Sequence, residues 1–129
     1  MTTTITRPPL DMTGIILSTL CLLHCLAVPI IATGALVWVA SEAIHISFTI
    51  ALAGIVLLVA WPSYQRHRRA VVPAFLVGGL VLLIVAVLSE SILGESAETI
   101  LTSFGSVMLV FGHVLNLRSM KMHSTGSPA

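Results

Sequence analysis

The residues best suited to chemistry in this chain are two cysteines and a histidine on one short stretch. Cys21, His24 and Cys25 stand in the run Cys-Leu-Leu-His-Cys. In an α-helix, at about 100° per residue, Cys21 and Cys25 lie ~40° apart and His24 lies ~60° to the other side of Cys21, so the three share one face. Thiolate and imidazole ligands suit a soft or borderline metal ion, here Hg(II), Cu(I) or Zn(II). Two thiolates alone suit near-linear Hg(II) or Cu(I), whereas tetrahedral zinc needs ligands from other helices.

The same cysteines have two other interpretations. A disulfide between them is disfavoured, because side chains one helical turn apart fit its geometry poorly. The other interpretation is that each is an ordinary small, buried residue. The presence of a histidine in the same turn, within an apolar segment, favours the metal site.

Three more ionisable residues are candidates for the same chemistry. Glu42 and His45 have the Glu-x-x-His spacing that helix bundles use for metals. The same spacing also fits a glutamate that stabilises the start of a helix and a histidine at the membrane surface, with no metal bound. His113 lies on a polar stripe that we expect to face inward. Hydrogen bonds between helices would by themselves explain the presence of the hydroxyl residues in this stripe. The other members of this stripe are Thr99, Thr102, Ser106 and Asn116.

Four long apolar runs must position these residues. Of the 129 residues 57% are apolar and 9% charged, and the mean hydropathy is +1.07, which leaves too few charges to coat a soluble globule. Runs at 13–37, 43–61, 71–89 and 98–117 approach the ~20 residues that span a bilayer as a helix. They lack the alternation of a membrane β-barrel. The sequence therefore predicts an all-α membrane protein, with four transmembrane helices in a bundle.

The charged residues predict the orientation of that bundle. The basic residues are confined to the two tails and the central loop: Arg7, Arg66, Arg68, Arg69, Arg118 and Lys121. The other two connections contain only acidic charges, so the positive-inside rule places both termini in the cytoplasm. We expect a tail over 1–11, the membrane domain over 12–118 and a disordered tail over 119–129. Glu42 and His45 then lie near the outer surface, the cysteines near mid-membrane and His113 nearer the inside.

The stretch Leu-Cys-Leu-Leu-His-Cys-Leu-Ala-Val-Pro at 20–29 resembles the signature of the MerC mercury-transport family. The similarity continues at 41–45, in the basic loop at 64–69 and at 112–117, and covers roughly residues 12–118. The resemblance implies a four-helix protein of the bacterial inner membrane that takes up Hg(II), with Cys21 and Cys25 as ligands. Mercury-resistance members carry a second cysteine pair near the C-terminus, whereas the tail here offers only Met120, Met122 and His123.

These observations lead to a multi-pass inner-membrane protein that binds or transports a metal ion and is not an enzyme. Its partners would be the lipid bilayer, the ion and a second copy in a homodimer, since one small bundle offers little wall for a pore. The nearly balanced charge gives no basic patch for nucleic acid. One alternative is a haem-binding or electron-transfer subunit with axial ligands among His24, His45 and His113. Another is a metal-free structural subunit.

Overall fold

The computed structural model describes residues 8–31, 42–67 and 70–125, and within these ranges the chain is helical without strands. The four helices are α1 (Pro8–Ile31), α2 (Glu42–His67), α3 (Val71–Leu93) and α4 (Glu95–Thr125). Each contains an apolar segment long enough to cross a membrane, with a mean hydropathy between 1.7 and 2.9. The predicted class, an all-α chain with four candidate membrane spans, is confirmed.

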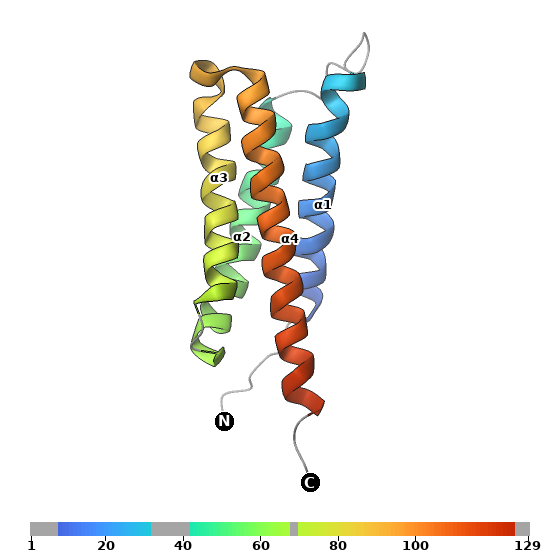
Figure 1. Cartoon of the computed structure of the whole chain (residues 1–129), viewed down its shortest axis with the longest axis vertical. Coiled ribbons are helices and arrows are strands. Elements are labelled where there is room, and N and C mark those ends of the chain that lie inside the picture. Colours follow the sequence, from blue (N-terminus) through green and yellow to red (C-terminus); the bar gives the residue numbers. More distant parts are fainter. Residues whose placement is uncertain (1–7, 32–41, 68–69, 126–129) are drawn as a thin grey trace.

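The helices form an up-and-down bundle in which the start of α1 and the end of α4 lie at the same end (Figure 1). α4 packs against α3 and α1, and α2 packs against the other sides of α3 and α1. Each helix therefore has two close neighbours, and the diagonal pairs are α1 with α3 and α2 with α4. α4 extends past the other helices at the end where the termini lie (Figure 1).

The surface and the interior of the bundle have the polarity expected in lipid. Large apolar side chains cover the outside, and Leu57, Leu88 and Ile92 are all more than two-thirds exposed. A surface of this kind is a liability in water but suits contact with acyl chains. The buried polar residues instead gather inside, and they are Asp11, Ser18, Ser63, Glu98, Thr102, Ser106, His113 and Asn116. The interior of the bundle is therefore more polar than its lipid-facing surface.

Close backbone contact fixes α3 against α4. A Cβ atom added at Gly79 would lie 2.7 Å from the carbonyl oxygen of Gly105, and one added at Gly105 would lie 2.8 Å from that of Gly79. Small residues at such crossings let membrane helices approach closely and gain van der Waals contact. Gly94, at φ +80°, supplies the left-handed residue between the two helices. Together these glycines make a tight α3–α4 hairpin.

The helix boundaries differ from the apolar runs in three places. α1 begins at Pro8, because a proline is tolerated in the first turn of a helix, so Asp11 belongs to the helix and not to a tail. α2 continues through Pro62 to His67, beyond residue 61, where the apolar run ends. Membrane helices tolerate proline where neighbouring groups satisfy the freed backbone. α4 reaches Thr125, within the segment expected to be disordered, and residues 126–129 lie outside the described part.

Candidate functional site

The two cysteines lie on the face of α1 that points into the bundle. Cys21 and Cys25 are each 3% exposed, both are free thiols, and their side chains interact with each other. The two residues are one helical turn apart, so their side chains lie next to each other on one face. Side chains in this relation fit the geometry of a disulfide poorly. The shared face expected from the sequence is therefore present.

Residues of α2 and α4 enclose the thiol pair. The Cys25 side chain interacts with His45 of α2 and with Thr102 of α4, and the Cys21 side chain interacts with Ser106 of α4. Thr102 donates its hydroxyl to the carbonyl of Glu98, 2.8 Å away, so the hydroxyl is held by its own helix. The thiols thus occupy the interior between three helices.

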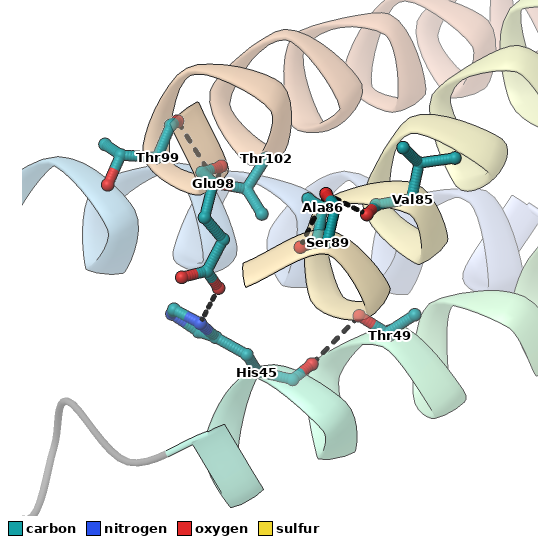
Figure 2. Close-up of polar contacts among 8 residues, drawn as sticks. All are labelled: His45, Thr49, Val85, Ala86, Ser89, Glu98, Thr99 and Thr102. Atoms are coloured by element: carbon teal, nitrogen blue, oxygen red, sulfur yellow. Dashed lines mark hydrogen bonds and ion pairs between the residues drawn. The ribbon is translucent and has the colours of Figure 1, made fainter. Parts of the chain in front are cut away.

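His45 is oriented by a carboxylate from the diagonal helix. Its Nδ1 lies 2.7 Å from Oε1 of Glu98, and the two side chains are 15% and 6% exposed (Figure 2). The carboxylate accepts the Nδ1 proton, which leaves Nε2 as the second functional nitrogen of the ring. Nε2 is buried and makes no hydrogen bond within the described part of the chain. A carboxylate behind a histidine is the arrangement that orients imidazole ligands in metal sites.

His24 borders the same region from α1. Its ring meets the ring of His45 edge-on, with 5.2 Å between centroids and 69° between planes, and it packs similarly on Phe48. The structure therefore brings His24 and His45 together with the cysteine pair. Glu42 begins α2, but its side chain lies outside the described residues, so its expected pairing with His45 stays a prediction.

His113 belongs to a separate group of buried polar side chains, which we call the inner cluster: Asp11, Ser63, His113 and Asn116. His113 Nδ1 lies 2.9 Å from Asp11 Oδ1, and Asn116 Nδ2 donates to Asp11 Oδ2 at 2.8 Å. Ser63 of α2 donates to Asn116 Oδ1 at 2.9 Å. On α4, His113 is seven residues from Ser106, or about 10 Å along the helix axis. The structure thus does not bring His113 to the thiols.

Sequence reasoning missed Asp11 and Glu98 as interior residues. Asp11 was assigned to a tail and Glu98 was only the first residue of the fourth apolar run, so neither was expected in the interior. A signal for Asp11 was present, since the inward face of α1 continues at alternating steps of three and four residues. These positions are Asp11, Gly14, Ser18, Cys21 and Cys25.

The metal-binding capacity of the site depends on the coordination number. Among the described residues, no group of three or more His, Cys, Asp or Glu side chains is arranged to hold a metal ion. A soft ion that takes two thiolates needs only Cys21 and Cys25, and these are already adjacent. The arrangement therefore suits a two-thiolate ion better than a tetrahedral zinc site.

Comparison with known proteins gives one match. A family model described as MerC mercury resistance protein matches residues 11–118, which is most of the chain. No curated protein and no solved structure matches. The matched range runs from Asp11 of the inner cluster to the end of the apolar part of α4, and it contains both cysteines.

Proposed function

Because the chain belongs to the MerC mercury resistance family, we propose that it carries Hg(II) across a membrane and that Cys21 and Cys25 bind the ion during passage. The family and the four candidate spans together make it a multi-pass membrane protein. The finer proposal is a bacterial inner-membrane location with both termini in the cytoplasm. Its support is the positive-inside distribution of charge, together with the position of the start of α1 and the end of α4 at one end of the bundle (Figure 1).

The observation that carries the proposal is the buried, reduced thiol pair. Both thiols are 3% exposed, free of a disulfide and in contact with each other inside the bundle. Thiolates are the protein ligands that soft ions prefer, and burial excludes competing water. A second cysteine pair is absent from the 129 residues, so only this pair offers thiolates to the ion.

His45 is the residue best placed to assist the thiols. Cys25 interacts with its imidazole, and Glu98 holds the opposite ring nitrogen. Thiols must lose their protons to bind a metal ion, so each ion bound displaces two protons. We assign His45 Nε2 the proton from Cys25, with the Glu98 carboxylate stabilising the resulting imidazolium. His24, in edge contact with His45, lies where it would accept the second proton or approach the ion.

The haem alternative fits the geometry less well. An axial haem pair requires two histidines that face each other across the macrocycle. The rings of His24 and His45 are in direct edge contact, which leaves no space between them for a porphyrin. His113 is held by Asp11 in the inner cluster. Both thiols and the residues that enclose them come from one chain, so the proposed site needs no second copy.

The proposal is tested by binding and uptake of Hg(II). Protein purified in mild detergent is titrated with Hg(II) in competition with a small thiol, and the same protein in liposomes is assayed for uptake into trapped glutathione. We expect one ion per chain and rapid uptake for the wild type, and loss of both in Cys21→Ser and Cys25→Ser. Parallel titrations with Cu(I) and Zn(II) rank the three ions.

A matched control is Met122→Leu, which removes an exposed soft sulfur atom far from the site. It should bind and transport as the wild type does. Full affinity in both single serine variants would refute the thiolate site. Tight binding without any uptake above that of empty liposomes would refute transport while leaving the site intact.

A further inference from the structure

The inward faces of α1 and α4 keep one antiparallel register over most of their length. Each step of three or four residues back along α1 is matched by an equal step forward along α4. The facing pairs are Cys25 with Thr102, Cys21 with Ser106, Gly14 with His113, and Asp11 with Asn116. The cysteine pair and the inner cluster are therefore two levels of the same helix–helix seam.

Polar groups without hydrogen bonds lie along this seam between the two levels. Ser18 Oγ and His113 Nε2 are buried and make no hydrogen bond within the described part of the chain, and Ser106 Oγ meets the Cys21 thiol but has no other hydrogen-bond partner there. All three residues are 0% exposed. Ser18 lies one turn from Cys21 and one turn from Gly14, against which the His113 ring packs. An unsatisfied buried polar group costs about 1–3 kcal/mol. His113 is in addition an ionisable side chain in the membrane interior, and such a residue is a functional candidate by default.

The chemistry of the inner cluster is that of a proton site rather than a second metal site. Both carboxylate oxygens of Asp11 are already engaged, one by His113 and the other by Asn116. The one open position in the cluster is His113 Nε2, on the ring edge opposite the nitrogen that Asp11 holds. A single open nitrogen exchanges one proton but cannot by itself enclose a cation.

Other charged groups do not compete for this position. Among the described residues, the titratable side chain in contact with His113 is Asp11 of α1. α2 contributes the neutral Ser63 through Asn116, and α3 presents Leu76 at the level of Gly112. The next cations along α4, Arg118 and Lys121, are exposed toward the helix end.

We propose that the inner cluster supplies protons to the cysteine pair when Hg(II) leaves it toward the side of the membrane where the termini lie, with the Ser18 and Ser106 hydroxyls and intervening water as carriers. This proposal rests on the proposed function, because it assigns a role within the same transport cycle.

The step balances in atoms and charge. Two thiolates of an acceptor on the inner side replace the two cysteine thiolates on Hg(II), and no oxidation occurs. His113 Nε2–H then gives its proton through the hydroxyls and water to the freed Cys21 thiolate. The deprotonated nitrogen takes a new proton from water on the inner side. The protons that His45 and His24 accept on loading leave to the opposite side of the membrane before release, so a second proton transfer by the same path restores Cys25. The empty pair is then ready for the next ion.

The experiment measures uptake into liposomes containing trapped glutathione, with the internal pH varied and the external pH fixed. The variants are Asp11→Asn, His113→Gln and Ser18→Ala. Dividing each rate by the wild-type rate at the same pH removes the effect of pH on the trap itself. Proton donation by a positioned group is worth about 10²–10⁴-fold, so we expect the first two variants to be at least tenfold slower and to lose their dependence on internal pH.

The matched control is Thr19→Val, which removes a hydroxyl next to Ser18 from the exposed side of α1. It should transport at the wild-type rate. Binding of one Hg(II) per chain in detergent should survive in all four variants, and this separates the proposal from the cysteine site itself. Asp11→Asn is nearly isosteric, so it keeps the test valid if His113→Gln does not fold.

A readout independent of transport is the infrared difference spectrum between loaded and empty protein. We expect bands of Asp11 and His113 that disappear in the corresponding variants. Folded variants that transport within twofold of the wild type at every internal pH would overturn the proposal. Loss of Hg(II) binding in Asp11→Asn would also overturn it, because the cluster would then belong to the binding site.

Discussion

A methyl group at Gly14 is the smallest change that tests the contact between α1 and the inner cluster. A Cβ atom at this position would lie 2.4 Å from His113 Nε2, 2.5 Å from Cε1 and 2.8 Å from Cδ2. Carbon atoms in contact prefer about 3.5–4.0 Å, so the His113 ring has to move by more than an ångström. The ring has little freedom, because Asp11 holds its other edge at 2.9 Å. We therefore expect Gly14→Ala to break the Asp11–His113 hydrogen bond or to separate the helices.

The expected change in the free energy of unfolding follows from three terms. Overpacking a well-packed interior costs about 1–3 kcal/mol. Losing an interhelical hydrogen bond in a membrane protein costs about 0.6–1.7 kcal/mol. Replacing a helical glycine by alanine returns about 1 kcal/mol of helix propensity. The net destabilisation is therefore about 0.6–3.7 kcal/mol, centred on the range of the first term alone.

The assay is reversible unfolding of purified protein in mixed micelles with increasing SDS, followed by circular dichroism. Gly54→Ala is the matched control, since a Cβ atom at Gly54 meets nothing within 4 Å. The control should be neutral or slightly stabilised, while Gly14→Ala should unfold at a lower SDS fraction. Equal stability of the two variants would refute the packing described between α1 and His113.

Two further predictions concern other contacts of the bundle. Glu98→Gln removes the negative charge that holds His45. Loss of a residue that orients a metal ligand reduces metal affinity by about 10–100-fold, so competition titration should show a weaker Hg(II) site of unchanged stoichiometry. Wild-type affinity would show that His45 takes no part in the site. Gly105→Ala places a Cβ atom 2.8 Å from the backbone oxygen of Gly79, and a backbone atom cannot move aside as a side chain does. SDS unfolding should therefore show that the free energy of unfolding falls by about 1–3 kcal/mol. A stability equal to that of Gly54→Ala would contradict the α3–α4 contact.

The sequence was sufficient to predict the four membrane helices and which face of the first helix points inward. Uninterrupted apolar runs predict membrane helices because the bilayer requires each span to satisfy its own backbone groups. The angle between Cys21 and Cys25 follows from helix geometry alone, and the structure confirms that both point inward. The family resemblance carried by residues 20–29 is confirmed by the match over most of the chain.

The neighbours across the bundle could not be predicted in the same way. Which side chains meet across the interior depends on the packing of all four helices, so the pairing of His45 on α2 with Glu98 on α4 has no local signal. Asp11 was misplaced because a charge before an apolar run looks like the end of a span. It is buried because Asn116 and His113, far away in sequence, satisfy both of its oxygens. α2 likewise extends past the apolar run that ends at residue 61, because a polar last turn gives no hydropathy signal for helix.

The most direct test of the central claim is the X-ray absorption spectrum of mercury in protein loaded with one Hg(II) per chain. The account predicts two sulfur ligands in near-linear geometry, both lost in the Cys21→Ser, Cys25→Ser double variant. A mercury environment of nitrogen and oxygen donors, or a spectrum unchanged in the double variant, would contradict a site formed by the buried cysteine pair.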